Sequence, residues 1–312
     1  MHIAGSTGHD ELARVYLAET APGNYVEFVE SLQPPFPREE KWVLIISTMY
    51  GCPVRCAMCD AGGWYRGKIS VEDIFEQIDY PIARRYTDRV IPVSKFKIQF
   101  ARMGEPSLND NVLAVLEELP GRYEAPGLMP CISSVAPGNT DAFFERLIDL
   151  KSRLYADGRF QLQFSIHSTD EQVRNKLIPI KKWSLSEISE YGRKYFCYGD
   201  RKIALNFALA ENCPVSPEKI ARIFDPEIFV VKFTPVNPTI TAENNGLVNS
   251  MANKECEKTC RLKESLYGYG FEVIISLGEL EENRIGSNCG QYIRRFLESG
   301  SKITAAYEYE II

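Results

Sequence analysis

The chain has 312 residues, of which 45% are hydrophobic and 25% are charged, and its net charge is −6 at neutral pH. This composition is typical of a globular protein, and the length is enough for one α/β barrel. The sequence has no apolar run of membrane-spanning length, and its acidic balance argues against a broad nucleic-acid surface, which would need clustered lysine and arginine.

Residues 1–40 are predicted to form a small N-terminal extension. Two segments with strand character, residues 13–17 and 25–29, flank a Pro22-Gly23 turn and should pair as a hairpin. A proline-rich connector over residues 33–37 then leads to the main unit, residues 41–312.

From Lys41 onward, apolar runs of strand length alternate with segments of helical periodicity, which predicts a parallel sheet covered by helices. We favour a partial (β/α)6 barrel, similar to a TIM barrel, over a doubly wound sheet. The reason is that unusual polar motifs follow the predicted strands, at the end where such barrels carry their chemistry. The predicted strands are residues 42–46, 96–100, 129–135, 160–166, 203–209, 228–233 and 271–276. The predicted helices include residues 71–78, 112–116 after a capping Asp110, 143–154, 185–195, 217–224 and 253–267.

Three cysteines follow the first barrel strand with the spacing C-x3-C-x2-C: Cys52, Cys56 and Cys59. Gly51 and Pro53 bend this loop, so that its thiolates can surround one compact object. A [4Fe-4S] cluster is usually held by four cysteine thiolates, so three leave one iron open. S-adenosylmethionine (SAM) can chelate an open iron through its amino and carboxylate groups, and the radical chemistry that follows belongs to the cofactor. We therefore predict a [4Fe-4S] cluster and SAM.

Two other interpretations of the cysteine loop were weighed. A structural zinc site needs a fourth ligand, which Cys256 or Cys260 could supply. A disulfide is disfavoured because the cysteine count, nine, is odd and the first residues lack the pattern of a secretion signal. The missing signal instead predicts the reducing cytoplasm, where thiols stay free to bind metal.

Polar residues at the ends of four predicted strands are candidates for binding SAM. A glycine lets backbone approach a ligand closely, a carboxylate can accept an amine, and residues two apart on a strand share one face. Each position alone is explained by a surface turn or a structural side chain, but together they predict a pocket. The candidates are Gly104, Glu105, Ser133, Ser165, His167 and Asn237.

Taken in order, the motifs resemble the RlmN/Cfr family of radical SAM methyltransferases, which methylate adenine carbons of ribosomal RNA. The matching segments are residues 51–59, 103–106, 165–167, 174–180, 235–238 and 288–291. The resemblance implies SAM contacts at Gly104, Glu105, Ser165, Ile166, His167 and Asn237. The family's hydroxyl at the third strand end aligns with Cys131 here, so the ribose contact is assigned to Ser133.

Cys289 matches the family's methyl carrier. In the family this cysteine accepts a methyl group from one SAM. A radical from a second SAM then takes a hydrogen from the S-methyl group, and the resulting carbon radical adds to an aromatic carbon. Without the resemblance, Cys289 would be interpreted as an inert buried cysteine in a loop.

Two departures from the family point to a different substrate. Ile45 stands where the family has a second, resolving cysteine, and only the hairpin stands where the family has a helical RNA-binding domain. Together with the acidic charge, these departures predict a small-molecule or peptide substrate, with ribosomal RNA disfavoured. Glu27 is the nearest counterpart of a carboxylate that acts as a base in the family, and a reductant such as flavodoxin or ferredoxin is expected.

Three alternative functions remain open. The chain could abstract hydrogen directly without methyl transfer, or serve as an iron–sulfur electron-transfer or sensor protein. It could also methylate ribosomal RNA with Cys131 or Cys213 as the resolving thiol.

Overall fold

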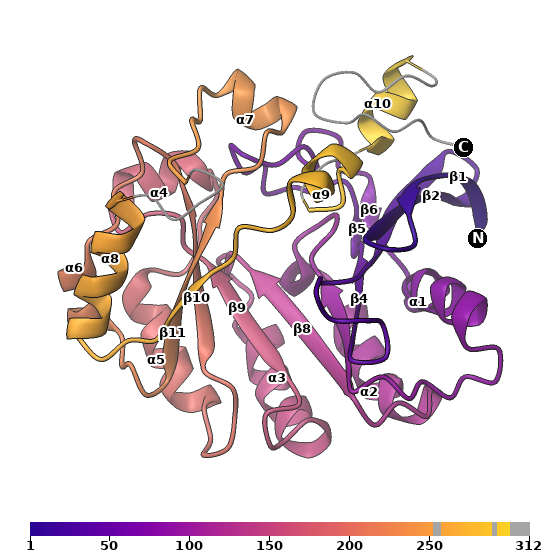
Figure 1. Cartoon of the computed structure of the whole chain (residues 1–312), viewed down its shortest axis with the longest axis horizontal. Coiled ribbons are helices and arrows are strands. Elements are labelled where there is room, and N and C mark those ends of the chain that lie inside the picture. The colour runs from indigo at the N-terminus through magenta and orange to yellow at the C-terminus, as the bar shows by residue number, and fades with distance from the viewer. Residues whose placement is uncertain (252–256, 289–291, 300–312) are drawn as a thin grey trace.

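A single sheet of ten strands organises the chain. The computed structural model describes residues 1–251, 257–288 and 292–299. The strand order is β1-β2-β3-β4-β7-β8-β9-β10-β11-β12; the first four strands pair antiparallel, and pairing is parallel from β4 onward. The parallel part curves into an open barrel with helices on its outer face (Figure 1). This architecture is the predicted partial barrel.

The strands are β1 (His2–His9), β2 (Ala13–Ala21), β3 (Asn24–Ser31), β4 (Lys41–Ile46), β5 (Met49–Tyr50), β6 (Gly67–Lys68), β7 (Lys95–Phe100), β8 (Leu128–Ser134), β9 (Gln161–Ser165), β10 (Ile203–Leu209), β11 (Phe229–Pro235) and β12 (Val273–Ile275). The helices are α1 (Val71–Arg85), α2 (Asn111–Arg122), α3 (Asp141–Leu154), α4 (Glu171–Leu177), α5 (Leu185–Tyr195), α6 (Pro217–Ile223), α7 (Ile240–Asn244), α8 (Glu257–Gly268), α9 (Leu280–Ile285) and α10 (Tyr292–Ser299). Among these described helices, none has both the length and the apolar character that a membrane crossing requires.

The barrel strands are apolar toward the helices and polar toward the barrel axis. On β7, Phe96, Ile98 and Phe100 are fully buried in the hydrophobic core, whereas the alternating Lys97 and Gln99 line the interior. Successive side chains of a strand point to opposite faces, so one short segment serves both surfaces. TIM barrels are usually filled by bulky aliphatic side chains. Here the polar lining encloses a cavity of about 400 Å³.

An aromatic cluster holds α3 and α5 against the outer face of the sheet. The ring of Phe144 lies 4.6 Å from that of Trp183, 5.1 Å from that of Tyr191 and 5.8 Å from that of Phe164, measured between centroids. Phe144 is fully buried. Paired aromatic rings of this kind contribute both buried area and favourable ring geometry.

The Phe144→Ala variant should therefore lose about 3–5 kcal/mol of unfolding free energy, because the cavity cannot be refilled by its rigid neighbours. Equilibrium urea unfolding measures this loss. Tyr198→Ala, at a fully exposed position, is the control and should stay within about 0.5 kcal/mol of the parent chain. A loss below about 1 kcal/mol for Phe144→Ala would show that the cluster does not secure the helices.

The N-terminal region differs in part from the prediction. The expected hairpin is present as β2 and β3, which pair around a turn with Ala21 opposite Asn24. The sequence did not predict β1, since its glycines and polar residues have low strand propensity. β3 also pairs with β4, with Val29 opposite Ile45, so the sheet continues into the barrel. The domain boundary near residue 40 stays a prediction.

One capping prediction was wrong. Asp110 occupies the N-cap position of α2, but its side chain forms no capping hydrogen bond. The backbone N–H of Asn111 donates instead to Oδ1 of Asn109 at 3.2 Å. Asn109 also donates to the backbone carbonyls of Thr48 and Ile69, so this buried amide joins α2 to the loop that follows β4.

Candidate cofactor site

The cysteine loop closes on itself directly after β4 and β5. The backbone N–H of Cys52 donates to the carbonyl of Ala61 at 2.7 Å, and that of Cys59 donates to the carbonyl of Cys56 at 3.1 Å. Gly51 has φ +74°, and a Cβ there would lie only 2.9 Å from the carbonyl oxygen of Trp64. The sharp bend predicted at Gly51 therefore depends on glycine.

The three thiols have different environments. Cys52 is buried, and its sulfur accepts hydrogen bonds from the backbone N–H groups of Val54 and Arg55. Burial raises the pKa of Cys52 to about 11, and the nearby carboxylate of Glu105 adds to this rise. A free thiol here is protonated at neutral pH. Since metal ligands are thiolates, metal binding at Cys52 has to displace this proton.

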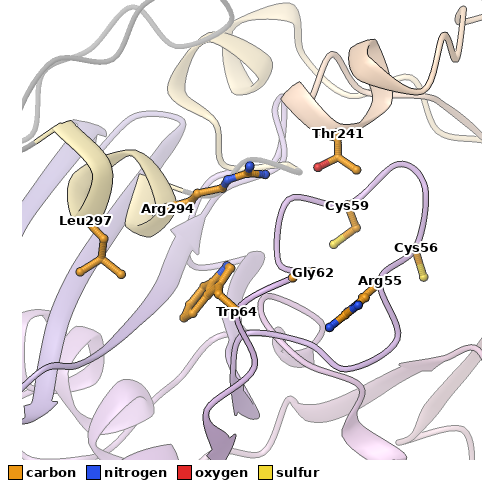
Figure 2. A pocket seen from close by; sticks show the side chains of 9 residues that line it. Arg55, Cys56, Cys59, Gly62, Trp64, Thr241, Arg294 and Leu297 are labelled. Atoms are coloured by element: carbon orange, nitrogen blue, oxygen red, sulfur yellow. The ribbon is translucent and has the colours of Figure 1, made fainter.

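Cys56 and Cys59 open onto space on both sides of the loop. Both line the barrel cavity and also an outer hollow of about 480 Å³ between the loop and α10 (Figure 2). Thiolates of a cubane cluster bind separate irons, whereas the ligands of one zinc ion converge on a point. Within the described ranges, no three Cys, His, Asp or Glu side chains converge in that way. Three thiols on one loop, two of them facing the space beside it, suit a cluster, whereas the buried Cys52 lines neither space. The zinc alternative also involved Cys256, which lies outside the described residues.

The segment around α7 holds the cysteine loop in place. The buried carboxylate of Asp60 accepts hydrogen bonds from the hydroxyl and the backbone N–H of Thr241 at 2.6 and 2.8 Å. Thr239 donates through its hydroxyl to the carbonyl of Met58 at 2.9 Å. The same segment begins with Asn237, which lines the barrel cavity. The cysteine loop and one SAM candidate are therefore positioned together.

The barrel cavity brings together residues from several strand ends. Ser165 and His167 both face it, but β9 ends at Ser165, and His167 lies beyond the strand with φ +63°, so the strand period does not explain its orientation. The residues predicted for the cluster or for SAM that line this cavity are Cys56, Cys59, Ser133, Ser165, His167 and Asn237.

Gly104 and Glu105 lie behind the cavity wall. Gly104 has φ +98°, and a Cβ there would come within 2.8 Å of the backbone nitrogen of Met49. Glu105 is buried and accepts hydrogen bonds from Val135 N–H at 3.0 Å and from the Ser107 hydroxyl at 2.7 Å and N–H at 3.2 Å. The Ser134 hydroxyl is a fourth hydrogen-bond partner. A carboxylate offers about four acceptor positions, so an amine would have to replace one of these donors.

His167 is a neutral side chain with a defined tautomer. Its Nδ1 accepts a hydrogen bond from the backbone N–H of Ala208 at 3.1 Å, so the ring proton is on Nε2. Burial, reinforced by the positive charge of Arg174, lowers the pKa of His167 to about 4. The backbone N–H of the neighbouring Ile166 donates to the carbonyl of Asn206.

The lowered pKa of His167 predicts a pH-dependent stability. In the unfolded chain this histidine is protonated near pH 6.5, whereas in the folded chain it is protonated only near pH 4. The free energy of unfolding therefore decreases as the pH falls through this window. His167→Asn keeps an acceptor for Ala208 and should reduce this loss between pH 7 and pH 4 by up to about 3 kcal/mol. Urea unfolding at a series of pH values measures it. His2→Asn, at an exposed position, is the control; equal slopes for the parent and His167→Asn would contradict the assignment.

The residue at the family's resolving position and the residue before its carrier position line the same cavity. Ile45, at the resolving position, lines the cavity, and so does Asn288. Cys289 itself lies outside the described residues. Cys131 is a buried thiol that lines the cavity. It is paired with Gln99 of β7, which is itself paired with Ile45 of β4, so the three residues lie side by side across the sheet.

Glu27 lies away from the cavity, in a fully buried ion pair with Arg102 at 2.7 Å. Its other oxygen accepts the backbone N–H of Ile293. Arg102 also donates to the carbonyls of Gly286 and Ser287 at 2.9 and 3.1 Å. This pair, the Glu27–Arg102 clasp, thereby binds both described ends of the segment that contains Cys289.

Sequence reasoning missed several polar residues of the site. Lys97 and Lys232 each interrupt an apolar strand, and this irregularity could have marked them as facing a cavity. Arg102 and Asp60 carried no comparable signal, because their partners are far away in the sequence.

The chain was compared with known proteins. No family model matches it. It is 28% identical over 301 residues to a probable dual-specificity RNA methyltransferase RlmN of Desulfitobacterium hafniense, covering 93% of this chain and 77% of the relative. It is 24% identical over 291 residues to the protein of the same name from Heliobacterium modesticaldum, covering 88% and 69%.

Among solved structures, a radical SAM methyltransferase from Sphaerobacter thermophilus has the same fold, with a TM-score of 0.68 at 18% identity over 88% of this chain and 76% of that one. Streptococcus suis SuiB, solved with SAM bound, matches with a TM-score of 0.51 at 16% identity over 78% of this chain and 51% of SuiB.

The barrel, the cysteine loop and these similarities together define a radical SAM enzyme, whose cofactors are a [4Fe-4S] cluster and SAM. Within that class the chain is similar over most of its length to proteins named as probable RlmN methyltransferases. The resemblance found in the motifs is confirmed.

Proposed function

We propose that this protein is a methyltransferase that uses Cys289 as its methyl carrier and acts on a small molecule or a peptide in the cytoplasm. When bound, the cluster and SAM supply radical chemistry and a methyl group, with electrons from a reductant such as flavodoxin or ferredoxin. The cluster ligands are Cys52, Cys56 and Cys59. The cavity-lining SAM candidates orient the cofactor, and the neutral His167 offers it an Nε2–H donor.

The observation that carries this proposal is the position of Asn288. This residue lines the same cavity as Cys56, Cys59 and His167, so the chain leading to Cys289 starts from the wall of the predicted cofactor site. A carrier thiol has to meet both SAM and the substrate, and the cavity wall is where both can be reached. The identity of the relatives as RNA methyltransferases supports methyl transfer as the reaction class.

Protein purified without oxygen and incubated with SAM should carry one extra methyl group on Cys289, detected by peptide mass spectrometry. SAM with a labelled methyl group should pass the label to this peptide. Cys197→Ala removes an exposed free thiol and should retain the mark, whereas Cys289→Ala should lose it. Deoxyadenosine formation with Cys289 unmodified under all conditions would favour direct hydrogen abstraction and reject the carrier role.

The Glu27–Arg102 clasp supports a positioning role for Glu27 in this mechanism. The carboxylate is fully buried, and its donors include two guanidinium N–H groups and the backbone N–H groups of Tyr292 and Ile293. Glu27 contacts the segment after Cys289, and its partner Arg102 contacts the segment before it, whereas Glu27 does not line the cavity. We therefore propose that Glu27 orients the carrier segment. Acting as a base would require it to leave these partners.

Glu27→Gln should lower the free energy of unfolding by about 3–5 kcal/mol, because it leaves the buried Arg102 without its counter-charge. Hydrogen exchange over residues 286–293 should become faster, and methylation of Cys289 should fall. Glu30, on the same strand as Glu27, is a buried carboxylate whose partner Arg85 also pairs with Asp10, and Glu30→Gln should leave this exchange unchanged. Full methylation of Cys289, unchanged exchange and no product in Glu27→Gln would instead support a base.

Methylation of ribosomal RNA is the second candidate, and Cys131 is the observation that favours it. Cys131 lines the cavity about 10 Å from Ile45, two strand spacings away, whereas Cys213 belongs to a hydrophobic cluster outside that lining. Cys131 is thus the better placed substitute for a resolving thiol. The content of methyladenosine in ribosomal RNA from cells with and without the gene separates this candidate from the first.

A further inference from the structure

Two lysines project into the barrel from strands on either side of β9. Lys97 of β7 donates to Oε1 of Gln161 at 3.1 Å, and Lys232 of β11 donates to Oε1 of Gln163 at 3.4 Å. The two glutamines are on the same face of β9, about 6–7 Å apart along the strand. Both ammonium groups therefore converge on one region of the lumen.

These ammonium groups have hydrogen-bonding capacity to spare. Each carries three donors, and each is bonded to one neutral amide oxygen. No Asp or Glu belongs to the described lining of the barrel cavity, and neither lysine forms an ion pair with a described carboxylate. Burying two like charges without a counter-charge is costly unless a ligand supplies one.

The pKa of Lys232 reflects its burial and the positive charge of its neighbour. Its pKa is lowered to about 8, first by burial and then by the positive charge of Lys97. Lys41 and Lys95, at the first positions of their strands, have lowered pKa values as well, in part because of Lys97. An anion in the lumen would relieve this repulsion.

A second opening leads to the lysines without passing the cysteine loop. A hollow of about 1100 Å³ lies between β4, the first strand of the parallel part, and β12. It is lined by both lysines, by Gln33 of the connector after β3, and by the carboxyl side chains Glu279 and Glu282. It shares Ile45, Gln99 and Asn288 with the barrel cavity, so the two spaces meet. A small molecule can reach the lysines from the side.

We infer that Lys97 and Lys232 form an oxyanion subsite that binds a carboxylate or phosphate group of a small substrate, which reaches it through the opening between β4 and β12. This inference rests on the proposed function, and it narrows the substrate to a small anionic molecule. Gln161 and Gln163 hold the two ammonium groups apart, so that both can contact the same anion. SAM also has a carboxylate, and binding of that group by the lysines is the alternative that the experiment has to separate.

The experiment uses the full chain with its cluster reconstituted and SAM present at saturation. Inorganic phosphate and malonate are titrated at constant ionic strength, with chloride as the balancing anion, and binding is followed by calorimetry. The variants are Lys97→Met and Lys232→Met, which keep the length of the side chain. Lys232→Arg keeps the charge, and Lys194→Met on the exposed face of α5 is the matched control.

The parent chain, Lys232→Arg and Lys194→Met should bind at least one of the two anions saturably, and preference for phosphate or malonate identifies the substrate group. Each methionine variant should weaken this binding at least tenfold and change SAM affinity less than twofold. Anion binding that persists in the double methionine variant overturns the subsite, as does no binding in the parent. A tenfold loss of SAM affinity would reassign the lysines to the SAM carboxylate. Methylation of Cys289, measured in the same proteins, reports on the proposed function separately.

Discussion

The hollow interior of the barrel depends on the alternation of side chains along each parallel strand. On β7, three fully buried apolar residues pack against the helices, and the lysine and glutamine between them face the axis. Because the outer face alone supplies the hydrophobic core, the inner face is free of the packing role that it has in a filled barrel. Amides, hydroxyls and amines can then line a cavity in which cofactor and substrate meet.

The Glu27–Arg102 clasp connects three parts of the chain that are far apart in sequence. Glu27 comes from the N-terminal strands, and Arg102 lies two residues before Gly104. Their partners lie at residues 286, 287 and 293. A buried ion pair costs desolvation and contributes little to stability unless all its donors and acceptors are satisfied. Here the remaining donors bind backbone carbonyls, which gives the pair a role in placing the carrier segment.

Much of the fold could be predicted from the sequence, because strands such as β10 are continuous apolar runs of strand length and amphipathic helices such as α5 have a clear period. Short or polar elements such as β1 and α7 have no such signal and were missed. The cysteine spacing predicted the cofactors. The positions of Glu27 and Arg102 could not be predicted, since their pairing depends on tertiary contacts across 75 residues. Likewise, sequence spacing cannot show that Glu105 lies behind the cavity wall while Ser165 lies on it.

The opening between β4 and β12 has a consequence for the order of events in the catalytic cycle. If a reactant arrives from the side, a cofactor already seated beneath the cysteine loop does not block its path. Once the carrier cysteine is methylated, the second SAM and the substrate can then bind in either order, because neither blocks the path of the other. Spent cofactor and finished product could also depart by separate routes.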